Sequence, residues 1–281
     1  MNGPDVPELP EVETTRRCLE PDLAGAVIVD VDIRRNRMVR RQARPRDFAD
    51  RLRSRRIRRL GRRGKFLMAD LDGDITWVTH LGMSGRVAMA MPDEPERPHT
   101  NVVVRTDRSR EFRLIDPRTF GFVVAWTPEE LEASSLGRLG PDAYDALPPS
   151  RILHETLGGR TAPIKALLLD QHLLAGLGNI YADEALHRSR IAPSRPGGSL
   201  TIEEVQRLRR AIRATLDAGL KWGGTSLDDL AYLLPDGRAG EYVHRLRVYG
   251  RNGEPCRRCQ SEIRRAVLRQ RSTHWCPQCQ T

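Results

Sequence analysis

The chain has 281 residues and a net charge of +10 at pH 7. This length allows a sizeable core and more than one domain, and the positive charge favours a polyanionic partner, nucleic acid first and anionic membrane second. No stretch approaches about 18 consecutive apolar residues, which excludes a membrane-spanning helix, and the acidic start is unlike a secretory signal. We therefore expect a cytoplasmic protein.

The first part of the chain predicts one helix followed by many strands. Residues 8–19 have helical spacing with carboxylates in the first turn, and we expect Pro21 and Gly25 to end this helix. Short runs rich in Val and Ile then alternate with turn residues, a pattern typical of an antiparallel sandwich or barrel. The runs are 27–33, 57–71, 75–79, 102–105, 112–115 and 122–126.

The second part predicts helices and a small terminal module. Glycine and proline residues over 139–150 indicate a linker. Helical spacing follows over 164–169, 180–188, 202–218 and 227–233, and Thr201 with Glu204 has the pattern of a capping box. The expected fold class is therefore α+β multidomain, with domains at 1–139, 140–235 and 236–281.

The strongest motif is a set of four cysteines, Cys256-x2-Cys259-x16-Cys276-x2-Cys279. Two Cys-x2-Cys pairs at this separation can hold one Zn²⁺ tetrahedrally, and because protein fills all four positions the zinc would be structural. A redox pair or unliganded thiols are the alternatives. Arginines such as Arg271 lie between the pairs, on the hairpin that the metal would hold, where they suit phosphate.

A second motif is the glycine-containing turn at residues 176–181, just ahead of a predicted helix. Glycines there would let the free backbone N–H groups of the helix start approach a phosphate closely. An ordinary helix–helix turn is the alternative, but the turn's position in a basic chain ahead of a zinc motif favours phosphate.

Seven motifs, in order along the chain, resemble the formamidopyrimidine-DNA glycosylase family. The resemblance covers nearly the whole chain from Pro7 onward, and it implies a bacterial repair enzyme that removes 8-oxoguanine and ring-opened purines and then nicks the strand. It also implies an N-terminal β-sandwich with a leading helix, a helix-two-turns-helix domain and a C-terminal zinc-finger β-hairpin. The motifs are residues 7–13, 64–65, 80–85, 116–121, 178–182, 248–251 and the four cysteines.

The resemblance assigns the chemical roles to the start of the chain. Pro7 would be the nucleophile on the sugar C1′, and Glu8 the adjacent acid that assists sugar ring opening. Lys65 would lie near the lesion phosphate and base; Lys165 and Lys221 are the only other lysines. Glu11 and Glu184 are candidate secondary acids, although favourable interaction with a helix dipole explains them equally well.

The resemblance also assigns contacts with damaged double-stranded DNA, bound by a monomer between the two halves of the protein and placing it on the bacterial nucleoid. A flipped base leaves a gap in the stack, which an apolar wedge, an aromatic ring and a guanidinium can fill. The residues in those positions are Met83, Phe120 and Arg118. Phosphate contacts fall on His80, Asn179, Tyr249 and Arg271, and Lys165 is either a further DNA contact or a solvated side chain.

The sequence departs from the family pattern in two places. Six residues precede Pro7, and inside a chain its nitrogen is a planar amide that cannot attack carbon. Because a GTG codon for Val6 can start translation, we expect synthesis to begin there, or a protease to cut after Val6. In addition, Val243 and His244, directly after the expected lesion-covering loop at residues 234–242, depart from the family pattern, and loops of this kind set which base is read.

The leading hypothesis is a bifunctional DNA glycosylase and abasic-site lyase of base excision repair. It would excise oxidised purines through an iminium at Pro7 and then cleave the strand by β,δ-elimination. One alternative is an endonuclease VIII-like enzyme that prefers oxidised pyrimidines. Another is a noncatalytic damaged-DNA binding protein, if the residues before Pro7 are retained.

Overall fold

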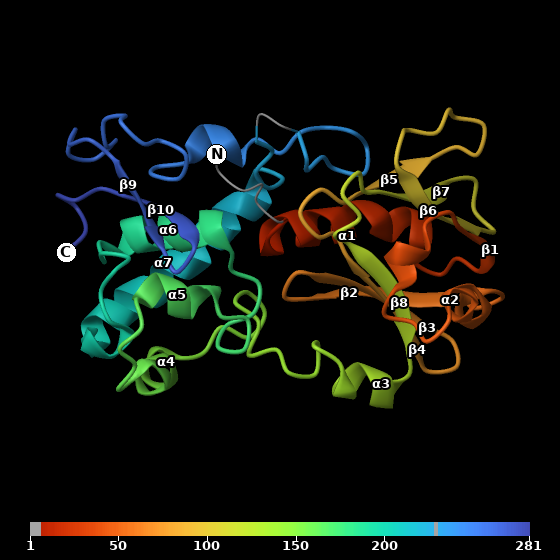
Figure 1. Ribbon diagram of the computed structural model, residues 1–281, viewed down its shortest axis with the longest axis horizontal. Helices are drawn as coiled ribbons and strands as arrows, with labels where there is room; N and C mark the ends of the chain where they lie inside the picture. The colour runs from red at the N-terminus through yellow and green to blue at the C-terminus, as the bar shows by residue number, and fades with distance from the viewer. Residues whose placement is uncertain (1–6, 228–229) are drawn as a thin grey trace.

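The computed structural model describes residues 7–227 and 230–281, and it has two halves that lie side by side (Figure 1). The strand-rich half comes from the first part of the chain, and the half made of α4–α7 and the C-terminal hairpin comes from the second. The expected translation start at Val6 lies outside the described residues. None of the helices within the described ranges has the length and apolarity needed to cross a bilayer.

The strand-rich half is a sandwich of two antiparallel four-stranded sheets, as predicted. Trp77 of one sheet packs edge-on against Phe112 of the other, with ring centroids 4.9 Å apart, and buried Val, Ile and Leu side chains fill the space around this pair. One sheet has the order β1 (Ile28–Ile33), β6 (Thr100–Thr106), β7 (Glu111–Ile115), β5 (Arg86–Ala90); the other has β2 (Ile57–Arg63), β3 (Phe66–Leu71), β4 (Ile75–His80), β8 (Phe122–Trp126).

The leading helix, α1 (Leu9–Leu23), is longer than the sequence predicts, and the expectation that Pro21 ends it is wrong. A proline inside a helix removes one backbone hydrogen bond at a cost of about 3 kcal/mol. Here Pro21 is exposed, whereas Leu19 and Leu23, four residues apart on one face, are buried in the sandwich core. The burial of these two leucines offsets the cost of the proline, so the helix continues beyond it.

The strand boundaries also differ from expectation. The run predicted over 57–71 is a hairpin, because Gly64 has φ +58 and Gly64-Lys65 form a two-residue turn between β2 and β3. The sequence analysis missed β5 and several short elements. These are η1 (Asn36–Val39), α2 (Pro45–Leu52) and α3 (Pro128–Ala133).

The second half is a helical domain with a hairpin attached. α4, which was not predicted, begins at the last residue of the expected linker, and the described residues of the expected helix at 227–233 are not helical. The capping box is present: Glu204 N–H donates to Thr201 Oγ1 (3.3 Å) and Thr201 N–H donates to the Glu204 carboxylate (3.0 Å). The elements are α4 (Ser150–Leu157), α5 (Ile164–Leu169), α6 (Asn179–Ser189), η2 (Gly197–Ser199), α7 (Ile202–Lys221), η3 (Tyr242–Arg245), β9 (Arg264–Leu268) and β10 (Arg271–Trp275).

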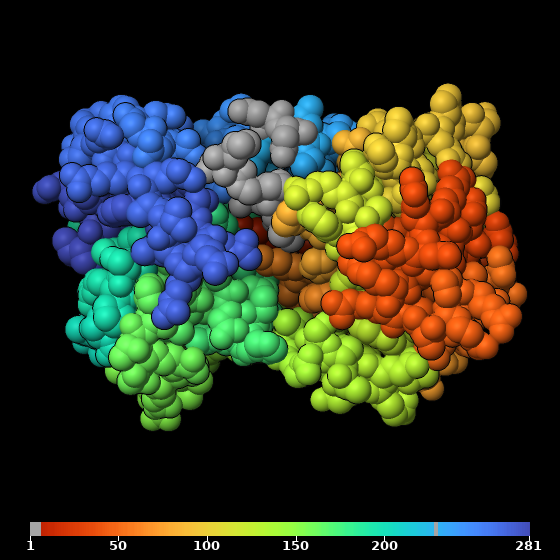
Figure 2. All heavy atoms as spheres, viewed as in Figure 1, coloured from red at the N-terminus to blue at the C-terminus, as the bar shows by residue number. Residues whose placement is uncertain are grey.

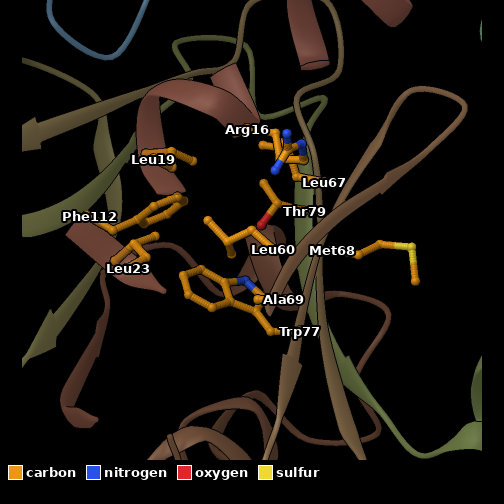
Figure 3. A pocket seen from close by; sticks show the side chains of 10 residues that line it. All are labelled: Arg16, Leu19, Leu23, Leu60, Leu67, Met68, Ala69, Trp77, Thr79 and Phe112. Atoms are coloured by element: carbon orange, nitrogen blue, oxygen red, sulfur yellow. The ribbon is translucent and has the colours of Figure 1, made fainter. Parts of the chain in front are cut away.

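A small, mostly apolar cavity lies inside the sandwich, against α1 (Figure 3). Leu19 and Leu23 of α1 line it together with Leu60, Trp77 and Phe112 from the strands. It is a gap in the packed core, because none of the predicted site residues reaches it. Figure 2 shows a different hollow, between the two halves, with the red start of α1 and the brown β2–β3 hairpin at its floor.

Candidate active site

The candidate site begins where the start of α1 meets the start of α6. Glu8 is 1 % exposed, and its carboxylate accepts hydrogen bonds from the backbone N–H groups of Gly178 (2.7 Å), Ile180 (2.7 Å) and Tyr181 (3.3 Å). A helix start offers such N–H groups to any anion. The Glu8 carboxylate therefore caps α6 from a position about 170 residues earlier in the chain.

The glycine residues ahead of α6 allow the Glu8 side chain to reach the start of this helix. A Cβ on Gly178 would clash with the Glu8 side chain, and a Cβ on Gly176, which has φ +108, would clash with Leu9. Because Glu8 occupies the N–H groups at this turn, the prediction that they bind phosphate is wrong for Gly178, Ile180 and Tyr181. The glycines allow close approach, but the approaching group is a carboxylate of the same chain.

Lys65 lies in the turn between β2 and β3. Its neighbour Gly64 packs so closely that an added Cβ would lie 3.3 Å from the Ala175 side chain, and Gly64 N–H donates to Asp142 (2.8 Å). Gly176, the residue after Ala175, contacts the start of α1, because Leu9 N–H donates to the Gly176 carbonyl (3.1 Å). The structure thus brings the Lys65 turn and the Pro7–Glu8 segment against one stretch of chain.

The two candidate secondary acids are buried anchors. Glu11 accepts hydrogen bonds from Tyr181 Oη (2.7 Å) and from Thr225 N–H (2.7 Å). Glu184 accepts the backbone N–H groups of residues 247–249, at 2.9 to 3.0 Å. Burial raises the pKa of both carboxyl groups above the ordinary value, although these hydrogen bonds oppose the shift. Each carboxyl group ties a helix to a later segment of the chain.

Two loops that carry the predicted stack-filling residues pack against each other. They are residues 81–85, between β4 and β5, and residues 116–121, between β7 and β8. Asp116 joins the two loops, since its carboxylate accepts hydrogen bonds from Ser84 Oγ (2.6 Å) and from Gly121 N–H (2.8 Å). Gly82, with φ +65, lies so close to Gly121 that any Cβ at this position would clash with its backbone. The backbones of both loops are therefore held in place without DNA.

The stack-filling residues themselves lie on these two loops. Phe120 is 40 % exposed, and the Arg118 guanidinium carbon lies 4.5 Å from the centroid of its ring. Met83 is half-buried in the first loop. The structure places an exposed aromatic ring beside a guanidinium, with a methionine on the neighbouring loop, and the contact of these three residues with DNA stays a prediction.

His80 lies at the end of β4, next to these loops. Its ring stacks on Phe122, and its Nδ1 accepts a hydrogen bond from Gly82 N–H (3.1 Å). Burial, and then the positive charge of Lys65 and of nearby arginines, lowers its pKa to about 4. The side chain is therefore neutral at pH 7, and any contact with phosphate would have to use the remaining ring N–H group.

The other predicted DNA contacts cluster around β10. Arg271 is exposed, whereas Lys165 is 1 % exposed; its Nζ donates to the Ser272 carbonyl (2.6 Å) and forms an ion pair with Asp183 (2.7 Å). Asn179 is half-buried and donates to Ser272 Oγ (3.1 Å). Tyr249 is 2 % exposed, with its ring edge-on to His274. Lys165 thus holds β10 onto the helical domain.

The four cysteines of the motif come together. Their Sγ atoms all lie within 4.8 Å of one another, and Cys256 and Cys276 are buried. Four thiolates at this spacing fit one tetrahedral Zn²⁺ with no open position. The site therefore fits one structural zinc, which would supply cohesion to the C-terminal hairpin, and Cys18 stands apart from it.

The sequence analysis missed the acidic residues that hold the site together. Asp142 binds both Gly64 N–H and the Arg62 guanidinium (2.6 Å), and Asp183 binds Lys165 and the backbone N–H of His274 (2.8 Å). The only signal available was an aspartate among apolar residues, such as Asp183 within 180–186. A buried carboxylate needs partners, but their identity comes only from the fold.

Comparison with known proteins places this geometry in a family. Three family models match in order: Formamidopyrimidine-DNA glycosylase N-terminal domain over residues 6–123, Formamidopyrimidine-DNA glycosylase H2TH domain over 139–230, and Zinc finger found in FPG and IleRS over 253–281. The formamidopyrimidine-DNA glycosylase of Heliobacterium modesticaldum is 46 % identical over 280 residues, with 98 % of this chain and 100 % of the relative covered.

Solved structures agree with the sequence relatives. The crystal structure of the MutM (Fpg) protein from Thermus thermophilus has a TM-score of 0.87 and 41 % identity, with 98 % of each chain covered. A complex of Lactococcus lactis Fpg with DNA that contains an abasic site has a TM-score of 0.89 and 32 % identity, and covers 98 % of this chain and 99 % of the other. This chain therefore belongs to the formamidopyrimidine-DNA glycosylase family, the DNA glycosylases of base excision repair.

Proposed function

We propose that this glycosylase removes oxidised purines from double-stranded DNA and then cleaves the strand, with the nitrogen of Pro7 as nucleophile. The observation that carries the proposal is the pairing of Pro7 with a carboxylate, that of Glu8, fixed by the start of α6. Family membership supports the substrate, since solved relatives are complexes with abasic-site DNA and with Fapy-dG DNA. The bacterial relatives support a cytoplasmic protein, and we expect it to work on the nucleoid as a monomer.

The first step is attack of the free Pro7 nitrogen on C1′ of the damaged nucleotide. The bond from C1′ to the base breaks, and the base leaves with the bonding electron pair and takes a proton from water, while the Pro7 nitrogen gives its own proton to Glu8. The sugar ring opens as O4′ takes a second proton, which leaves an iminium between Pro7 and C1′. Loss of a C2′ proton then expels the 3′ phosphate, and a second elimination expels the 5′ phosphate.

Glu8 is suited to move the proton. Its carboxylate is held by three N–H donors, so that it cannot swing away when the nearby nitrogen reacts. As an anion it can take the proton from the attacking amine and return it to O4′, since proton transfer needs a group held within hydrogen-bond reach. Lys65, in the turn beside this segment, is assigned to the lesion phosphate. Glu11 and Glu184 support the helices.

The remaining residues are assigned to DNA binding. Met83, Arg118 and Phe120 would fill the gap left by the flipped base, because their loops are preformed and Phe120 is already exposed. Arg271 would contact phosphate from the hairpin, Asn179 and Tyr249 from beside β10, and His80 from the end of β4. Lys165 would contribute to DNA binding indirectly, by holding β10 in place. We place the functional divisions at 1–139, 140–235 and 236–281.

The proposal requires Pro7 to be the first residue of the active protein. The decisive experiment is borohydride trapping on an 8-oxoguanine:cytosine duplex, comparing the 281-residue chain with a version that starts at Pro7. Borohydride reduces an iminium to a stable amine, so a protein–DNA cross-link reports the intermediate itself. A Pro10→Ala variant of the Pro7-start protein is the matched control, because that proline nitrogen stays within the chain.

We expect cross-links from the Pro7-start protein and its Pro10→Ala variant, but none from the 281-residue chain. Duplex binding without any cross-link, on this duplex and on an abasic-site duplex, would replace the proposal with the noncatalytic alternative. Cross-links on an oxidised-pyrimidine duplex but not on 8-oxoguanine would keep the proline chemistry and replace the purine assignment with endonuclease VIII-like specificity.

A further inference from the structure

Helix α6 presents three buried polar side chains to the C-terminal part of the chain. Asp183 accepts the backbone N–H of His274 in β10 (2.8 Å), and Glu184 accepts the N–H groups of residues 247–249. The third is His187, four residues after Asp183 and so on the same side of the helix. Its side chain is 0 % exposed, and the repair chemistry does not use it.

His187 faces the cysteine cluster. Its Nε2 lies 3.5 Å from Sγ of Cys256, which is itself buried and is one of the four thiols that fit a zinc ion. The other ring nitrogen, Nδ1, has no hydrogen-bond partner among the residues that the structure describes. A neutral imidazole carries its proton on one nitrogen only. Because Nε2 alone has an acceptor in reach, we assign the proton to Nε2.

The sulfur of Cys256 is a suitable acceptor for the His187 N–H. A zinc-bound thiolate keeps part of its negative charge on sulfur, and hydrogen bonds to metal ligands orient them and tune the site. Here the donor belongs to α6 of the helical domain, whereas the four cysteines belong to the terminal unit at residues 256–279.

We propose that His187 is a positioning residue for the zinc site: its Nε2–H donates to Cys256 Sγ and joins metal retention to the docking of the terminal unit on α6. Removing the donor should weaken zinc retention about tenfold, the lower end of what partners of metal ligands contribute. The proposal is independent of the Pro7 chemistry, since it concerns a different part of the chain.

The test uses three variants at His187 and one control variant, all of the full chain. His187→Phe keeps a ring of similar size but has no donor. His187→Gln places an amide N–H about where Nε2 lies, whereas the shorter side chain in His187→Asn cannot reach the sulfur. Ser189→Ala is the matched control, because it loses two hydrogen bonds to the carbonyls of Ala185 and Leu186 in the same helix without touching a cysteine.

The first readout is the rate at which the zinc-loaded protein gives up its metal to a chromogenic chelator under native conditions. The second is the thiolate-to-metal charge-transfer band after replacement of zinc by Co²⁺. A hydrogen bond lowers the energy of the sulfur electrons, so its loss should move this band to longer wavelength. A general loosening of α6 would leave the band where it is.

We expect about tenfold faster zinc release and a band at longer wavelength for His187→Phe, with His187→Gln and Ser189→Ala close to the unaltered protein. If the Phe variant does not fold, His187→Asn takes its place with the same expected result. Zinc release and band unchanged in the Phe or Asn variant would overturn the proposal. So would a Gln variant that releases zinc as fast as the Phe variant.

Discussion

Replacing Lys165 with methionine tests whether this lysine acts on DNA directly or through the hairpin. The side chain is 1 % exposed, and its ammonium bonds Asp183 and the Ser272 carbonyl. Methionine has nearly the same length and no charge. The Lys165→Met variant would therefore keep the packing but leave the Asp183 carboxylate buried without its cation.

The free energy of unfolding that Lys165→Met should lose can be estimated from these contacts. Removing one partner of a buried ion pair costs about 3–5 kcal/mol, because the remaining charge stays desolvated. This is a large part of the 5–15 kcal/mol by which domains are usually stable. In the double variant Lys165→Met/Asp183→Asn no charge remains, and the asparagine oxygen still accepts the His274 N–H. We expect the double variant to recover part of the loss.

The assay combines urea unfolding with duplex binding at several salt concentrations. Lys221→Met is the matched control, because this lysine is exposed and its loss should change stability by no more than about 0.5 kcal/mol. A lysine that contacts no phosphate leaves the dependence of log K on log salt unchanged, whereas loss of one phosphate contact makes the slope shallower by about 0.9. We expect Lys165→Met to lower the free energy of unfolding and to leave the slope of log K against log salt unchanged.

The opposite pattern would refute this reasoning. If Lys165→Met unfolds at the same urea concentration as the unaltered protein but binds DNA with a shallower salt slope, the lysine must leave its buried position and contact phosphate. The ion pair with Asp183 would then describe only the protein without DNA.

Four further predictions concern the reaction, the metal and pH. In the Pro7-start protein, Pro7→Gly should lower base excision at least about a hundredfold and spare duplex binding, measured by gel assay. Glu8→Gln should slow excision more than cleavage of a preformed abasic site; equal losses would contradict its proton-transfer role. Removing zinc should loosen DNA binding, because Arg271 loses its support, and unchanged affinity after verified metal loss would count against this. Finally, His80 has a pKa of about 4 when folded against 6.5 ordinarily, so the stability it contributes, at most about 3 kcal/mol, is present above pH 6.5 and lost as pH falls toward 4. Urea unfolding of His80→Asn should therefore depend less on pH over this range than that of the unaltered protein.

Much of the architecture follows from local sequence pattern. The spacing of the cysteines predicts the zinc site, and the alternation of short apolar runs with turns predicts the sandwich, because both depend on residues within about twenty positions of each other. The missed β5 is a weak alternation over Arg86–Ala90, and the missed turn at Gly64-Lys65 lies inside a continuous run. Local pattern cannot show where such a run folds back.

The tertiary structure decided the partners of the charged groups. Glu8 reaches Gly178 across about 170 residues, which turned a predicted phosphate-binding turn into a binding site for a carboxylate of the same chain. Lys165, expected at the DNA surface, is buried against Asp183. A charge leaves water only where the fold brings it an opposite charge or hydrogen-bond donors. The sequence by itself determined which chemical groups are present, and the fold determined which of them meet.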